Sequence, residues 1–93
     1  MRIAICDDNE IQIGIFMHRI KNFLKRNGDI KALITPYDKG QPLIDDVADG
    51  EWYDIVVLDI VLREENGIEV AKELRLNGYD GNIIFWTAHK EYV

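Results

Sequence analysis

The sequence predicts an α/β fold in which a parallel β-sheet is covered by helices on both faces. The strongest observation is the run Ile55–Leu58, which is apolar throughout and largely β-branched, as in strands that are buried on both faces. Strand-like and helix-like segments also alternate along all 93 residues with short connections, which is typical of parallel sheets. In addition, several strand-like segments end at carboxylate or hydroxyl side chains, which would gather at one edge of such a sheet.

The first strand is expected at Arg2–Cys6 and the first helix from Asn9 to about Arg26. Asn9 and Gln12 have the spacing of a helix capping box, and Asn27-Gly28 is typical of a helix end. Apolar residues at three- and four-residue steps should form the buried face of this helix. They are Ile13, Phe16, Ile20, Phe23 and Leu24.

The second strand is expected at about Ile30–Thr35. Lys31 and Pro36 suit an edge position, because an edge strand tolerates a charge and a missing backbone donor. The second helix should begin within residues 38–41 and end at Asp49-Gly50. Its buried stripe is expected to contain Leu43, Ile44, Val47 and Ala48.

The third strand is expected at Tyr53–Asp59, and a loop should follow it over residues 60–65. Asn66 and Glu69 have capping-box spacing and predict the start of a third helix, which ends at Asn77-Gly78. The side chains expected to face inward from this helix are Ile68, Ala71 and Leu74.

The fourth strand is expected at Asn82–Thr87, and residues 88–93 should begin a fourth helix. The sequence contains no internal repeat, low-complexity segment or linker, so a single domain over residues 1–93 is expected.

Composition narrows the class of protein. The net charge of −6 argues against direct binding of nucleic acid or of an anionic membrane surface by this domain. No apolar run approaches the roughly 20 residues that span a bilayer, and the first apolar run is too short for a signal peptide. The single cysteine, Cys6, lies in an apolar strand and is interpreted as a buried thiol of a cytoplasmic protein.

Four side chains that could do chemistry follow or end three of the strands. If the first, third and fourth strands are neighbours, Asp7, Asp8, Asp59 and Thr87 converge at one edge of the sheet. Three carboxylates at such close range repel one another unless a cation neutralises them, and Mg²⁺ is the simplest candidate. An aspartate beside Mg²⁺ can attack phosphorus to form an aspartyl phosphate, while a threonine hydroxyl can hydrogen-bond a phosphoryl oxygen.

The alternative is that these residues only form turns and helix caps. That interpretation is favoured for Asp8 taken alone, because Asp and Asn are common after strands. It is less convincing for four such residues at separate strand ends.

With these residues the chain resembles the receiver domain of two-component response regulators. The resemblance is carried by Asp7-Asp8, Leu58-Asp59-Ile60, Gly67 eight residues after Asp59, Thr87-Ala88, and Lys39-Gly40 in the turn after the second strand. Residues 66–69 and 87–92 are more similar to the branch that carries a LytTR-type DNA-binding domain. The resemblance implies a flavodoxin-like, doubly wound parallel sheet with strand order 2-1-3-4.

The resemblance also implies a role for each site residue. Asp59 would accept a phosphoryl group from the phosphohistidine of a sensor histidine kinase, and signal to an output such as transcription regulation without being a turnover enzyme. Asp7, Asp8 and Asp59 would hold Mg²⁺, with the backbone carbonyl of Val61. Thr87 would supply the switch hydroxyl, and Ala88 would keep the adjacent space small.

Two departures from the family pattern stand out. Arg63 occupies the place, four residues after Asp59, where the family usually has proline. The family's fifth strand, with its lysine, and its fifth helix have no counterpart in these 93 residues, and Lys90 is not a convincing substitute for that lysine. The expected domain is therefore a receiver that is incomplete at its C-terminus. The exposed fourth-strand edge would favour a homodimer or a higher assembly.

Two other functions remain as alternatives. One is a receiver-like protein-binding or dimerisation module that is not productively phosphorylated. The other is a phosphoaspartate hydrolase, which is disfavoured because such enzymes place a second aspartate where this chain has Val61.

Overall fold

The computed structural model describes residues 1–28 and 31–86. Within them, strands and helices alternate as the sequence predicts, beginning with a strand that leads directly into the longest helix. The elements are β1 (Arg2–Cys6), α1 (Glu10–Arg26), β2 (Leu33–Tyr37), α2 (Gly40–Ala48), β3 (Ile55–Asp59), α3 (Gly67–Leu76) and β4 (Asn82–Trp86).

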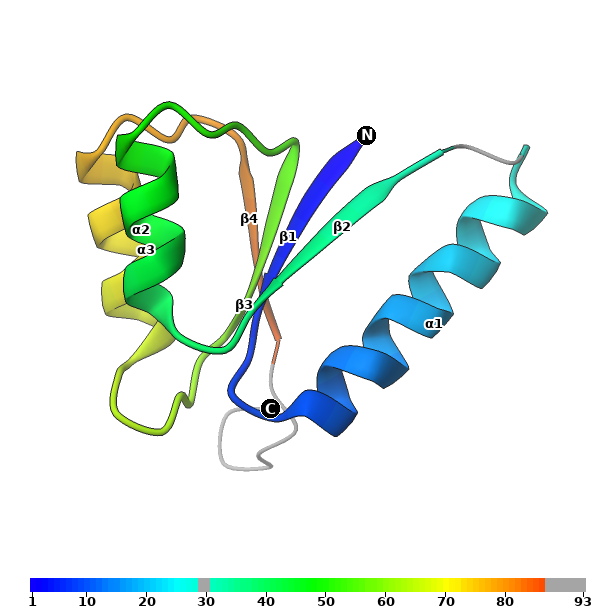
Figure 1. Cartoon of the computed structure of the whole chain (residues 1–93), viewed down its shortest axis with the longest axis horizontal. Coiled ribbons are helices and arrows are strands. Elements are labelled where there is room, and N and C mark those ends of the chain that lie inside the picture. Colours follow the sequence, from blue (N-terminus) through cyan, green and yellow to red (C-terminus); the bar gives the residue numbers. More distant parts are fainter. Residues whose placement is uncertain (29–30, 87–93) are drawn as a thin grey trace.

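The strands form one parallel sheet in the order β2-β1-β3-β4, as predicted. Cys6 pairs with Leu58 and Asp59 pairs with Trp86, so β1, β3 and β4 reach the same edge of the sheet. Helix α1 lies on one face of the sheet, whereas α2 and α3 lie together on the other (Figure 1). This two-sided arrangement confirms the doubly wound α/β fold.

Each face of the sheet has its own hydrophobic core. Ala4 and Cys6 of β1 pack beneath α2 and α3, while Ile3 and Ile5 pack beneath α1. Strand β3 divides its side chains in the same way, and the buried Val57 lies on the α1 side. Burial on both faces explains why these strands lack apolar/polar alternation in the sequence.

Strand β2 begins three residues later and ends two residues later than predicted. It covers Leu33–Tyr37 and not Ile30–Thr35, and Ile30 lies outside the described residues. Tyr37 explains the shift, because its ring is buried and its hydroxyl lies 2.6 Å from both the Asp46 carboxylate and the Tyr53 hydroxyl. The edge position is confirmed, and Pro36 lies inside the strand at that edge.

The helix ends agree with the prediction more closely than the buried faces of the helices do. Asn9 and Asn66 accept hydrogen bonds from backbone N–H groups of their helices, and Gly78 has a φ of 90° just after α3. Three side chains expected to be buried are exposed, namely Phe23, Ala48 and Ile68. Phe23 and Ala48 each lie beside a correctly predicted buried residue, namely Leu24 and Val47.

Cys6 is fully buried, and burial, with smaller contributions from nearby carboxylates, raises the pKa of its thiol to about 12. The thiol is therefore protonated and unreactive at neutral pH, as expected for a core residue. Among the described residues, no helix is both long and apolar enough to cross a membrane.

Candidate metal centre at the carboxyl edge of the sheet

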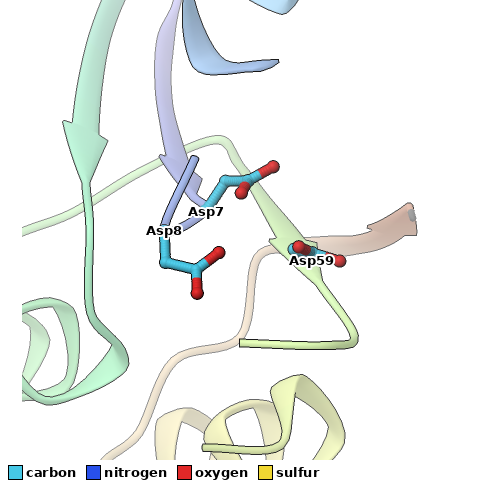
Figure 2. A group of neighbouring side chains, drawn as sticks. All are labelled: Asp7, Asp8 and Asp59. Atoms are coloured by element: carbon cyan, nitrogen blue, oxygen red, sulfur yellow. The ribbon is translucent and has the colours of Figure 1, made fainter. Parts of the chain in front are cut away.

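Three aspartates meet where the two central strands end. Asp7 and Asp8 directly follow β1, and Asp59 is the last residue of the neighbouring β3 (Figure 2). One carboxylate oxygen from each residue lies within 4.8 Å of the other two. The predicted convergence of these carboxylates is thereby confirmed.

The three aspartates differ in exposure. Asp7 and Asp59 retain only 2% and 6% of their accessible surface, while 25% of the Asp8 side chain is exposed. A buried carboxylate needs hydrogen bonds or a cation, because it has lost most of its contact with water. Asp8 therefore forms the solvent-facing side of the cluster.

Backbone donors hold the two buried carboxylates in place. The Asn9 N–H donates to Asp7 Oδ1 at 2.9 Å, and the Asp7 N–H donates to the Tyr37 carbonyl at 3.0 Å. The Val61 N–H donates to Asp59 Oδ1 at 3.2 Å. The Asn9 and Val61 bonds close short local turns, which fix the Asp7 carboxylate just after β1 and the Asp59 carboxylate at the end of β3.

The electrostatic cost of the cluster appears at Asp7. Burial is the main cause that raises the pKa of its carboxyl to about 6, with further contributions from the charges of Asp59 and Asp8, although the Asn9 N–H opposes the shift. A cation would favour the ionised form of all three groups. An all-oxygen donor set of this kind fits a hard ion such as Mg²⁺.

The free energy of unfolding of the metal-free protein should depend on the protonation of Asp7. Its folded-state pKa of about 6 exceeds the ordinary pKa of 3.8 of an aspartate carboxyl. The protonated form is therefore favoured by folding, and this stabilisation is lost as pH rises from about 4 through about 6. We expect a loss of roughly 1 to 3 kcal/mol. Urea denaturation in chelator at about pH 4 and pH 7.5 measures it.

Asp7→Asn is the matched control for this measurement, because it cannot titrate. Because the charges of Asp59 and Asp8 interact with Asp7, the difference between wild type and variant reports the titration of Asp7 together with its coupling to these two carboxylates. Parallel dependences of unfolding free energy on pH in the two proteins would contradict the assignment.

The loop after β3 depends on Gly67 at the start of α3. The Gly67 N–H donates to the Ile60 carbonyl at 2.8 Å, which brings the helix start against the end of β3. A Cβ atom at this position would overlap the Asp59 carbonyl oxygen, and would lie 3.0 Å from the Ile60 Cα. Glycine is needed here for close approach of two backbones.

Two loop residues next to the aspartates have contacts that sequence reasoning missed. The Arg63 Nε lies 3.9 Å from Asp8 Oδ2. The Glu65 carboxylate accepts a 2.6 Å hydrogen bond from the Gly40 N–H, and so caps α2, whose own N-cap residue Lys39 makes no side-chain cap bond. Glu65 is thus partly buried. No local pattern indicates either contact, since both join segments that are distant in the sequence.

The structure describes some of the predicted site residues, whereas others lie outside the described residues. Asp7, Asp8 and Asp59 come together, and Val61 follows within hydrogen-bonding distance of Asp59. Thr87 and Ala88 lie outside the described residues. Trp86, the last residue of β4, pairs with Asp59 in the sheet.

Comparisons with known proteins agree with this geometry. A model of the response regulator receiver domain matches residues 3–93. Accessory gene regulator protein A of Staphylococcus epidermidis is 29% identical over 92 residues, which cover 98% of this chain and 39% of that protein. The chain thus spans about two fifths of the length of this curated relative.

Solved structures show the same similarity. Response regulator protein TrrA from Thermotoga maritima, in complex with Mg²⁺ and BeF, has a TM-score of 0.69 and 33% identity, covering 98% of this chain and 72% of that one. The N-terminal domain of a response regulator/sensory box/GGDEF three-domain protein from Carboxydothermus hydrogenoformans has a TM-score of 0.75 and 24% identity, covering 97% and 66%. The second likeness concerns the fold alone.

Proposed function

Because the chain belongs to the response regulator receiver domain family, we propose that Asp59 accepts a phosphoryl group from the phosphohistidine of a sensor histidine kinase. Receiver domains are phosphoacceptors in signalling and not classical enzymes. The single observation that carries the proposal is the placement of Asp59 within 4.8 Å of two further carboxylates at the carboxyl edge of the sheet.

The metal in this proposal is Mg²⁺. Asp8 and Asp7 would hold it directly or through water, together with Asp59 and the Val61 carbonyl. TrrA, which is 33% identical, was solved with Mg²⁺ and BeF, and this supports the choice of ion. When bound, the ion would neutralise the carboxylates and the charge on the transferred phosphoryl oxygens.

The proposed step is a direct displacement at phosphorus. An Asp59 carboxylate oxygen attacks phosphorus, the bond from phosphorus to the histidine nitrogen breaks, and that nitrogen keeps the electron pair and takes a proton. Because β3 ends at Asp59, the strand fixes the nucleophile while the Val61 N–H holds Oδ1. Thr87 is proposed to hydrogen-bond the phosphoryl group and Ala88 to leave it space, since both follow Trp86, the sheet partner of Asp59.

The output is proposed to be transcription regulation in the cytoplasm, through a part of the protein other than this domain. The name of the accessory gene regulator relative supports a gene-regulatory output, and the resemblance to the LytTR-type branch points the same way. The net charge of −6 makes direct binding of DNA or an anionic membrane by the domain itself unfavourable.

Small-molecule phosphodonors test the acceptor function without knowledge of the kinase. The chain is incubated with acetyl phosphate, with Mg²⁺ or with chelator, and intact mass is measured. We expect the mass gain of one phosphoryl group only with Mg²⁺. Folded protein that binds Mg²⁺ but gains no phosphoryl group would favour the alternative, a receiver-like binding module that is not productively phosphorylated.

We also propose self-assembly through the β4 edge. In the part of the chain that the structure describes, β4 pairs only with β3, and its Ile84 and Phe85 are 49% and 42% exposed. An apolar strand edge of this kind favours pairing with a second copy. Sedimentation velocity at micromolar concentrations should show a dimer or larger species.

Phe85→Lys should shift that assembly toward monomer, because it places a charge on the exposed strand. Leu76→Lys is the matched control, since Leu76 is 79% exposed at the end of α3 and not on β4. A monomeric wild type, or equal effects of the two substitutions, would contradict assembly through β4.

A further inference from the structure

Arg63 lies in a structured loop after β3, and its side chain reaches Asp8. Val61 and Asn66 form an antiparallel bridge, and the Leu62 N–H donates to the Glu65 carbonyl at 3.2 Å. Leu62 is also buried, with 6% of its surface exposed, so it anchors the turn to the core. Arg63 follows this anchor and therefore projects from a fixed base.

The guanidinium of Arg63 lies beside the most exposed of the three carboxylates. Its Nε is 3.9 Å from Asp8 Oδ2, while 79% of the Arg63 side chain remains exposed. Both residues line a cleft of about 340 Å³ between the loops that follow β2 and β3. A guanidinium stays charged at all ordinary pH values, so it is a permanent source of positive charge in this cleft.

Mg²⁺ and Arg63 would therefore both interact with the Asp8 carboxylate. In the function proposed above, on which this inference rests, Asp8 helps to hold the ion. Arg63 already supplies positive charge to Asp8 and partly relieves the repulsion among the three carboxylates. Binding of the ion would have to break or weaken this pair.

We propose that Arg63 is a resident counterion that competes with Mg²⁺ for Asp8 and lowers the metal affinity of the site. The exposed position of the guanidinium makes the competition modest and dependent on salt. It also allows the side chain to swing into solvent when the metal binds, without repacking the core. Arg63 would thus affect the metal only through its ion pair with Asp8.

Mg²⁺ alone is the probe, and its dissociation constant is measured by calorimetry and by tryptophan fluorescence. Arg63→Gln should lower the dissociation constant roughly two- to fivefold, the range that corresponds to an exposed ion pair. Arg63→Lys keeps the charge and should stay close to wild type. Raising the ionic strength with NaCl should bring wild type and Arg63→Gln together, since the pair is screened.

Lys39→Gln is the matched control, because Lys39 lines the same cleft and no ion pair of Lys39 is seen within residues 1–28 and 31–86. An effect of net charge alone would appear equally in Lys39→Gln and Arg63→Gln, and would overturn the proposal. Unchanged affinity in Arg63→Gln, with measurable binding by wild type, would also overturn it while leaving the proposed function intact. If neither wild type nor Arg63→Gln binds Mg²⁺, the proposed function itself fails, and this inference fails with it.

Discussion

Asp59→Asn should abolish Mg²⁺-dependent phosphoryl uptake, because the amide is not a nucleophile toward phosphorus. The substitution has nearly the same shape, so the fold should persist at this 6% exposed position. Intact mass after incubation with acetyl phosphate should show no phosphoryl adduct, whereas the wild type gains one. Far-ultraviolet circular dichroism verifies that the variant remains folded.

Asp8→Asn separates the acceptor from the metal ligands. It removes one carboxylate from the cluster but leaves Asp59, so phosphoryl uptake should slow and then recover when more Mg²⁺ is supplied. Asp45→Asn, on the exposed surface of α2, should take up a phosphoryl group as wild type does.

If Asp59→Asn gained a phosphoryl group at the wild-type level, the acceptor would be another residue and the proposed function would be wrong.

Gly67→Ala should destabilise the protein and displace the site. The added Cβ would overlap the Asp59 carbonyl oxygen and lie 2.9 Å from the Asp59 carbonyl carbon, and backbone atoms cannot rotate away as a side chain does. We expect a loss of about 1 to 3 kcal/mol in the free energy of unfolding, the usual range for overpacking. Urea denaturation measures the stability, and acetyl phosphate labelling measures the rate of phosphoryl uptake, which should fall as well.

Gly14→Ala provides the opposite expectation from the same chemical change. Gly14 lies inside α1, and a Cβ there would meet nothing within 4 Å. Alanine in a helix interior is favoured over glycine by roughly 0.8 to 1 kcal/mol, so this variant should be more stable than wild type. Similar stability changes at the two positions would show that the contact with the Asp59 backbone does not constrain Gly67.

Gly67 shows what the resemblance to a family can indicate and what it cannot explain. The sequence resemblance singles out Gly67 by its spacing from Asp59, but gives no physical reason for glycine there. The structure supplies the reason, because the start of α3 packs against the backbone that carries the acceptor carboxylate. Arg63 is the converse case. It departs from the family pattern, and only the folded loop shows that its guanidinium reaches Asp8.

The sequence by itself determined the kind and order of the elements, the caps at the starts of α1 and α3, and the side chains at the strand ends. These features depend on local periodicity and on near neighbours in the chain, as at Asn9 and Asn66. Together with the alternation of strands and helices along the chain, they also predicted that Asp7, Asp8 and Asp59 share one edge of the sheet.

The tertiary structure decided everything that depends on contacts between distant segments. The register of β2 follows from the buried Tyr37, whose hydroxyl partners come from α2 and from the segment before β3. The pKa of Asp7, raised to about 6, follows from burial and from the carboxylate of another strand. The pairing of Arg63 with Asp8 likewise exists only once two loops meet. Burial and charge proximity belong to the packed molecule, and no local pattern encodes them.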